Sequence, residues 1–325
     1  MKTFQKSLIA ASVGAVMLAA AGTASANSLL FPFFTTASGA QSALSISGNS
    51  AISGNIAGKE TLHYVYNYGD ACTHYDGNAT ITANDLMQHS IASPTTAGGY
   101  GKAASADGST PFYFPLANSF GFLVVSSKTT SGVTTDLISG DMAIVDPSTG
   151  LVVSYAGISN GLDTSVANNE GNFGAGAVPV QNDNNFNLSA YGSGLVDTSW
   201  YGVVVGNMSP AISGNRNWTG ASSLSNNGLV YDNDEQSFSG AMKKRLSCAG
   251  KFAAADLLTS AQQAAVGPNG GLIHATGTPL TLAADGLTSI DASTGLVLSK
   301  IQVVKAAVGA PFAGKMFLHR EAKAF

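Results

Sequence analysis

A serine motif typical of esterases lies at residues 157–161, which read Gly-Ile-Ser-Asn-Gly after an apolar run at 151–155. In serine hydrolases this G-x-S-x-G pattern forms a sharp strand-to-helix turn that presents the nucleophile, here Ser159. The next ten residues are polar and rich in Asn, which disfavours a long helix. His274 follows in an order that suits a triad, but no alternating strand–helix pattern supports a hydrolase fold. We therefore interpret the motif as a chance match in a Gly- and Ser-rich chain.

Acidic and histidine side chains are scattered without a recognised catalytic or metal-binding spacing. Asp141 with Asp146, or Glu170 with Asp183, could act as the paired acids of a glycosidase, but the sequence does not rank them. No H-E-x-x-H pair occurs among the histidines. Three of them lie near Cys72, where a metal cluster is an alternative to solvated or core residues. The five histidines are His63, His74, His89, His274 and His319.

A short acidic segment offers hard oxygen ligands for Ca²⁺ at Asp232, Asp234 and Glu235. It lacks the twelve-residue EF-hand pattern, so the alternative is an acidic turn facing the basic residues 243–245. The sequence indicates no other metal site and no cofactor.

The first 26 residues have the pattern of a cleavable secretory leader. Lys2 and Lys6 precede a mainly apolar stretch at 8–21, and small residues ending in Ala24-Ser25-Ala26 follow. This order predicts cleavage between Ala26 and Asn27. The apolar stretch is shorter than the roughly 20 residues that span a bilayer, although a membrane anchor is the alternative. We expect a leader at 1–26 and a body at 27–325 of one or two sub-domains, in the periplasm, secreted or on the cell surface. The Ala-rich leader is bacterial in style.

Charge is scarce in this chain. Charged residues make up 10 %, against roughly 25 % in an average soluble domain, and the net charge is −4. Apolar residues reach 45 %, so the chain is not of the disordered class. A nucleic-acid partner is not expected, because such binding needs a basic surface. No later apolar stretch is long enough for a membrane-spanning helix.

Only two cysteines are present, Cys72 and Cys248. In an exported chain such a pair favours one disulfide. Two buried free thiols are the alternative. The loop model assigns a cross-link of this separation about 5 kcal/mol as an upper figure.

The start of the predicted body is strongly apolar, with Leu29, Leu30, Phe31, Phe33 and Phe34 around a proline. Proline restricts a strand to an edge, to its first residue or to a bulge. We expect the first strand of the domain, or alternatively an assembly strand that completes the sheet of a neighbouring subunit. Such exchange would give self-association.

Short strand patterns separated by Gly, Asn, Ser and Asp predict a mainly β, sandwich-like fold of antiparallel sheets with irregular insertions. Tyr64, Tyr66 and Tyr68 alternate along one strand and predict a core wall, with a sugar-stacking platform as the alternative. Two short helices are expected, at 252–266 before Gly267 and from Thr82 onward. The related segments at 146–154 and 291–299 predict a reused hairpin turn. The expected strands lie at 29–34, 62–68, 112–116, 121–126, 142–145, 151–155, 201–205, 280–283, 296–304 and 315–319.

These features favour a non-enzymatic exported protein, such as a surface, matrix, filament or adhesion subunit. Two other classes stay open: a secreted hydrolase or carbohydrate-binding module, and an outer-membrane β-barrel.

Overall fold

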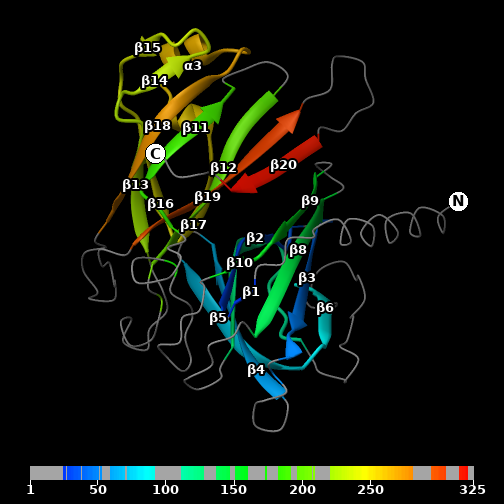
Figure 1. Ribbon diagram of the computed structural model, residues 1–325. Helices are drawn as coiled ribbons and strands as arrows, with labels where there is room; N and C mark the ends of the chain where they lie inside the picture. Colours follow the sequence, from blue (N-terminus) through cyan, green and yellow to red (C-terminus); the bar gives the residue numbers. More distant parts are fainter. Residues whose placement is uncertain are drawn as a thin grey trace, which may run out of the picture. The chain divides into compact units, whose positions relative to one another are not determined.

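The computed structural model describes several separate ranges of the chain, which are given at the end of this paragraph. Strands dominate and pair antiparallel, and the described segments hold one α-helix, so the mainly β, sandwich-like prediction is confirmed. Contacts divide the chain into unit 1 (1–66 and 75–170) and unit 2 (67–74 and 171–325) (Figure 1). No described helix is long and apolar enough to cross a membrane. The described residues are 25–26, 28–37, 39–50, 52, 59–69, 72–91, 111–127, 137–146, 151–159, 173, 182–191, 196–206, 208, 220–280, 294–304 and 315–320.

Unit 1 contains two sheets. The first has the order β1-β8-β3-β6, with β9 also on β8, and the second has the order β10-β2-β7-β4-β5. Phe31 of β2 lies 3.2 Å from the position that a Cβ on Gly140 of β8 would occupy, so the two sheets pack through this glycine. The strands are β1 (Ser25–Ala26), β2 (Ser28–Thr35), β3 (Gln41–Gly48), β4 (Lys59–Tyr68), β5 (Thr73–Thr82), β6 (Leu86–Ser90), β7 (Phe120–Ser127), β8 (Ile138–Asp146), β9 (Leu151–Ala156) and β10 (Ile158–Ser159).

The proline-containing strand β2 has a register shift against β7 between Phe31 and Phe34. Of the three positions expected for the proline, an edge, a strand start or a bulge, the structure has the bulge, because Pro32 has no backbone N–H for the ladder. Tyr155 of β9 binds the bulged backbone: its hydroxyl donates to the Phe33 carbonyl and lies 3.3 Å from the Phe33 nitrogen. Burial raises the pKa of this phenol, which therefore stays neutral and can donate.

Tyr155→Phe is expected to lower the free energy of unfolding by about 1 to 2 kcal/mol, because the buried Phe33 carbonyl loses its donor. Urea unfolding measures the change. Tyr191→Phe is a matched control, since that tyrosine is partly exposed in unit 2. Equal stability of Tyr155→Phe and wild type would contradict the role of the phenol.

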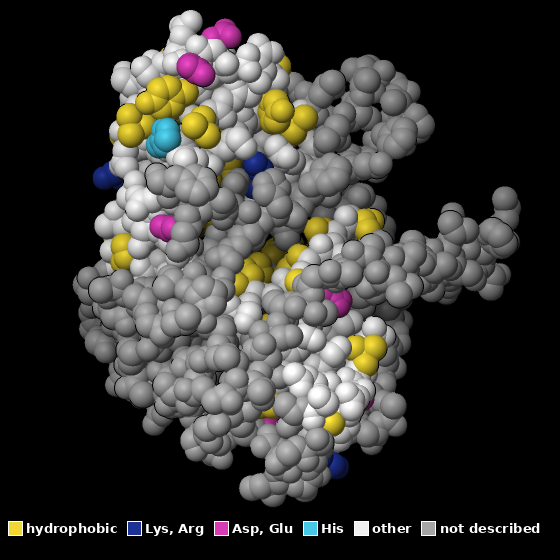
Figure 2. All heavy atoms as spheres, viewed as in Figure 1, with side chains coloured by type: hydrophobic (Ala, Val, Ile, Leu, Met, Phe, Trp, Pro, Cys, Tyr) yellow, Lys and Arg dark blue, Asp and Glu magenta, His cyan; other side chains and the backbone are white. Residues whose placement is uncertain are grey.

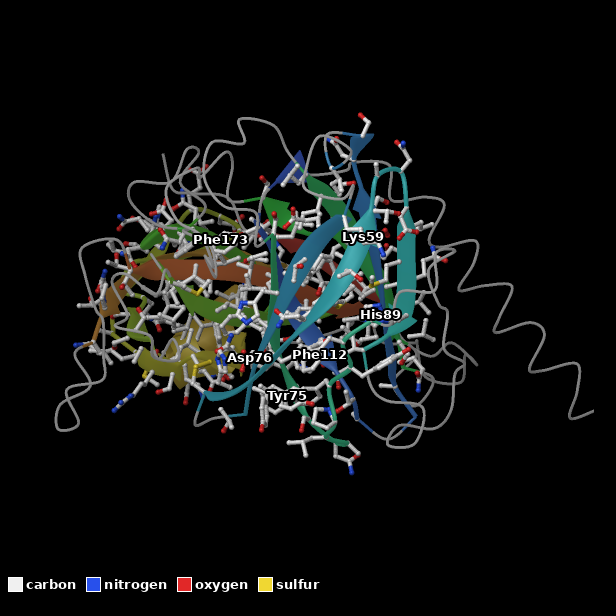
Figure 3. The ribbon with its side chains drawn as sticks, turned by 90° about the horizontal axis from the view of Figure 1, so that it is seen from below. Lys59, Tyr75, Asp76, His89, Phe112 and Phe173 are labelled. Atoms are coloured by element: carbon white, nitrogen blue, oxygen red, sulfur yellow. A yellow bond between two sulfur atoms is a disulfide. The ribbon has the colours of Figure 1, made fainter. Side chains whose placement is uncertain are left out.

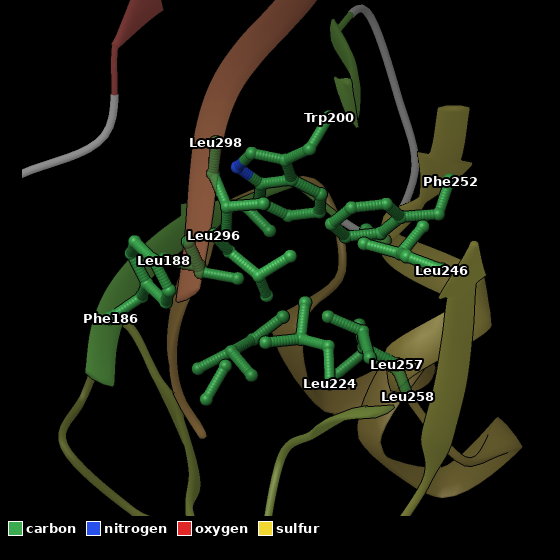
Figure 4. Packing of buried hydrophobic residues seen from close by; sticks show 14 of the residues in the cluster. Phe186, Leu188, Trp200, Leu224, Leu246, Phe252, Leu257, Leu258, Leu296 and Leu298 are labelled. Atoms are coloured by element: carbon green, nitrogen blue, oxygen red, sulfur yellow. The ribbon is translucent and has the colours of Figure 1, made fainter. Parts of the chain in front are cut away.

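Unit 2 also contains two sheets, with orders β17-β12-β19-β20 and β15-β14-β18-β13-β16; β11 pairs with β18. Their core is built from both sheets, with Trp200 stacked on Phe252 at 5.4 Å between ring centroids (Figure 4). Burying such large aromatic side chains is a main source of stability. The strands are β11 (Asn185–Ala190), β12 (Val196–Val205), β13 (Ala221–Ser225), β14 (Val230–Asp232), β15 (Ser237–Phe238), β16 (Lys243–Ser247), β17 (Ala249–Ala253), β18 (Gly271–Pro279), β19 (Gly295–Val304) and β20 (Lys315–Arg320).

The helix expected at 252–266 is only partly present. Phe252 and Ala253 end β17, a 3-10 turn follows at Ala254–Leu257, and α3 spans Ser260–Val266. Thr259 caps α3 by accepting from the Gln262 backbone, and Gly267 ends the helix at φ 44°. The C-terminal half of the expected helix is present as α3. Phe252 lies in strand β17 instead, where its ring stacks on Trp200.

The helix expected from Thr82 is wrong. Thr82 ends β5, and residues 83–85 form a turn that leads into β6. Asn84 has φ 59°, which asparagine tolerates better than most residues, and its backbone nitrogen donates to Gly48. The Thr-Ala-Asn-Asp segment therefore makes a strand-to-strand corner, because long-range backbone pairing to Gly48 replaces a helical first turn.

A buried polar network fixes the loops around α3. The Asn226 amide donates to the Leu257 carbonyl and the Gln262 side chain, while its oxygen accepts from the backbone of Gly228 and Met242. Gln262 in turn binds the carbonyl of Gly240 at 2.8 Å. Both amides are fully buried, so every lost partner leaves an unsatisfied group.

Asn226→Leu is therefore expected to lower the free energy of unfolding by about 2 to 4 kcal/mol, since the buried Leu257 carbonyl loses its donor and two partly buried backbone N–H groups lose their acceptor. Chemical denaturation followed by tryptophan fluorescence measures it. Asn233→Leu is the matched control, because Asn233 is exposed and is not part of this network. A loss below 0.5 kcal/mol would contradict the network.

Candidate functional site

The predicted disulfide is present. Cys72 and Cys248 are bonded, with 5.1 Å between their Cα atoms, and both group with unit 2. Cys72 follows the β4 strand in a turn, where its nitrogen donates to Gly69. Cys248 is the corner at which the chain leaves β16 and enters β17, and its backbone binds Gly220 and Val204. The bond therefore joins a hairpin turn to a corner between two sheets, and it is compatible with folding in an oxidising compartment.

The tyrosine row of β4 faces an aromatic cluster. Tyr64 and Tyr66 are buried, which is the predicted core arrangement, and Tyr68 is half-buried. Phe112 stacks on Tyr75 at 5.1 Å and receives the Tyr66 hydroxyl on its carbonyl (Figure 3). The Phe112 ring fills the space beside Gly77: three of its atoms lie within 2.4 Å of the position that a Cβ on residue 77 would occupy. Because Tyr64 and Tyr66 are fully buried against neighbouring rings, these two members of the β4 row do not form an open sugar platform.

His89 of β6 is the unusual polar group of this cluster. It is 3 % exposed, and the centre of its ring lies 5.9 Å from that of Tyr64 and 5.6 Å from that of Tyr113. Neither ring nitrogen forms a hydrogen bond with any residue in the described part of the chain. Burial lowers the pKa of its imidazole to about 3. His89 is therefore neutral at physiological pH and suited to packing, not to proton transfer near neutrality.

A second histidine is paired with a carboxylate. His63 Nε2 lies 3.1 Å from Asp76 Oδ2, between β4 and β5, with the carboxylate half-exposed. A His–Asp pair orients an imidazole in many enzymes, but catalysis also needs a nucleophile beside it. The described residues hold no group of three or more His, Cys, Asp or Glu side chains that could bind a metal ion, so His63, His74 and His89 are not brought together as a metal cluster.

The other candidate residues lie apart. Ser159 belongs to β10 and pairs with Leu29, so it stands in a strand and not at a described strand-to-helix turn. Asp232 Oδ1 accepts from the backbone of Asp234 and Gln236, which gives an acidic turn next to Glu235. Lys244 pairs with Asp256 at 3.5 Å instead of with this turn. Asp146 ends β8 and Asp183 bridges to Leu296, while Glu170 and residues 1–24 and 27 lie outside the described residues. The side chain of His319, in β20, is likewise outside what the structure describes.

The candidate assembly strand lies inside its own sheet. β2 has β10 on one side and β7 on the other, and Leu29, Leu30, Phe31 and Phe34 are buried, with Phe33 half-buried. Donating this strand to a neighbour would expose these side chains unless a second copy returned an equivalent strand. Intramolecular pairing is thus the arrangement in this structure, and strand exchange stays a hypothesis.

No family model matches the chain, and no curated protein matches it. The functional argument therefore uses the residues and geometry of this chain alone.

Proposed function

We propose that the chain is an exported, non-enzymatic structural or adhesion subunit that acts at the cell surface. The observation that carries this proposal is a chain of antiparallel β-sheets with one disulfide, Cys72–Cys248, that follows a segment with the pattern of a secretory leader. Antiparallel sheets with a disulfide keep their structure in an environment without chaperones or reductant.

The surface chemistry supports the same role. Among the described atoms on the face seen in Figure 2, charged side chains are few, and white and hydrophobic atoms outnumber them. A sparsely charged exterior rich in hydroxyl and amide groups favours contacts with neutral partners and with other copies, because self-repulsion is weak. Self-association in this proposal uses external surfaces, since β2 is already paired on both sides.

The test follows the full chain in producing cells. Fractionation with intact-mass analysis is expected to find a surface-exposed product that begins at Asn27, and electron microscopy is expected to show it assembled on the exterior. Val16→Arg, which breaks the apolar leader, should keep the full-length chain inside, whereas the control Val16→Leu should be exported. A product that keeps residues 1–26, or a mature protein that is monomeric and missing from the surface, would contradict the proposal.

A further inference from the structure

The outer face of the β11–β18–β13–β16 sheet is separate from the features discussed so far. Alternate residues of these strands, including Phe186, Leu224, Leu246 and Ile273, form the core of unit 2. Because side chains alternate between the two faces of a strand, the residues between them point to the other face. Figure 1 shows β11, β18 and β13 running beside one another, in agreement with their pairing.

Strand register arranges this outer face in rows. One row runs Lys243–Ser225–Thr276–Asn185, and the next contains Arg245, Ser223 and Thr278. Neighbouring strands lie about 4.8 Å apart, so the longer row extends about 14 Å. A third row pairs His274 with Asn187. Cations stand at the β16 edge, with the hydroxyls of Ser223 and Thr278 beside them. Ser225 is buried and its Oγ accepts from the Asn227 backbone, while Thr276 Oγ1 donates to Asn185 Oδ1.

The charge on this face is one-sided. Lys243 and Arg245 are exposed, and neither forms an ion pair with any residue that the structure describes. Among the residues of β11, β13, β14, β16 and β18 only Asp232 is acidic, and its Oδ1 already accepts two backbone hydrogen bonds. The two cations therefore make the β16 edge the part of this face that attracts anions, whereas Asp183, whose Oδ1 accepts from the Asn185 backbone, lies at the opposite end of the longer row.

The remaining side chains select the class of anion. Asn185, Ser189 and Thr278 are exposed, and Tyr231 packs edge-on against His274 at 5.5 Å. Hydroxyl and amide groups donate and accept hydrogen bonds, which suits the hydroxyls of a sugar. A membrane partner would need an apolar face to insert, and nucleic acid would need a broader basic surface. We infer that this sheet face binds an anionic polysaccharide, with Lys243 and Arg245 on its acidic groups. Its hydroxyls would meet the accessible side chains of Ser223, Thr278 and Asn185. The inference deepens the proposed function, since it names the partner of a surface subunit.

Binding is tested with purified mature protein, so its outcome is independent of the localisation experiment. Polygalacturonate, a uronate polymer, is the probe, with neutral dextran as the reference ligand. Wild type is expected to bind polygalacturonate at low ionic strength at least tenfold more tightly than dextran, and 0.5 M salt should abolish most of this preference. The double variant Lys243→Ser/Arg245→Ser is expected to lose at least tenfold in affinity.

Two further variants separate the face from net charge. Lys59→Ser/Lys251→Ser removes two exposed cations elsewhere and should stay within twofold of wild type. Ser223→Ala/Thr278→Val keeps both cations and should weaken binding about threefold, because the central hydroxyls are lost. All variants should keep the wild-type melting temperature within about 3 °C. Of the four residues changed on this face, Lys243, Arg245 and Thr278 are exposed and Ser223 is half-buried.

Several results would overturn the inference. They are equal binding of polygalacturonate and dextran, an equal loss in the Lys59/Lys251 control, or full affinity in the hydroxyl variant. Binding to anionic phosphatidylglycerol vesicles but not to polygalacturonate would assign the face to a membrane and would also overturn it.

Discussion

Replacing Cys72 and Cys248 together with serine is expected to lower the free energy of unfolding by about 3 to 5 kcal/mol. The bond joins residues 176 positions apart, so the cross-linked unfolded chain loses much of its freedom. The loop model gives about 5 kcal/mol for such a separation, and strain or residual structure reduces the figure. The enclosed segment, 72–248, contains strands of both units, so both should lose stability.

Urea unfolding can follow the two units separately. Tryptophan fluorescence reports on the core of unit 2 through the buried Trp200, while hydrogen exchange of the backbone amides of β2 and β7 reports on unit 1. Reductant provides a matched control: the chain has no other cysteine, so dithiothreitol should destabilise wild type and leave the double serine variant unchanged. Equal midpoints for the two proteins, or native thiols that react with iodoacetamide without reductant, would contradict the role of the bond.

The sequence predicts the features of this fold that are local or that depend on composition. Pro32 limited β2 to an edge, a start or a bulge, and the bulge is present. Gly267 predicted the end of α3, and the alternation of Tyr64 and Tyr66 predicted that both are buried. The pairing of the cysteines followed from their number. Each of these depends on one backbone restriction or one periodicity, which short segments of sequence carry.

The features that the sequence did not predict depend on long-range pairing. Lys243–Ser247 was not among the expected strands, and its three cations suggested only a partner for the acidic turn. It is an edge strand beside β13, where such charges are common. β18 was missed because Gly271 and Gly277 interrupt its apolar alternation. A Cβ on residue 271 would lie 2.3 Å from the Tyr231 carbonyl oxygen. The close approach of the β14 backbone therefore requires a glycine at this position. The burial of His89 away from water likewise depends on contacts between β6, β4 and residue 113, which are far apart in the sequence.

Acidification is expected to destabilise unit 1 through His89. Burial lowers the pKa of its imidazole to about 3, whereas an unfolded histidine titrates near 6.5. Between these values the unfolded chain binds a proton that the folded chain does not, so stability falls as the pH drops below 6.5. Each pH unit costs about 1.4 kcal/mol, which amounts to about 4 to 5 kcal/mol near pH 3.

His89→Phe is expected to remove this loss, because phenylalanine keeps a ring between Tyr64 and Tyr113 and has nothing to protonate. At pH 7 the variant should be as stable as wild type or about 1 kcal/mol more stable, since two unpaired ring nitrogens are gone. His274→Phe in unit 2, where the ring is partly exposed, is the matched control and should keep the wild-type pH profile.

The difference between variant and wild type isolates His89 from other titrating groups. Burial raises the pKa of Asp141, so that carboxyl has the opposite sign and favours the folded state as the pH falls. Because Asp141 is present in every protein compared, its contribution cancels in the difference at each pH. Unfolding midpoints of unit 1 at pH 7, 5.5 and 4 should therefore diverge progressively between wild type and His89→Phe. Parallel profiles over this range would show that His89 takes up a proton without cost and that its surroundings are open to water.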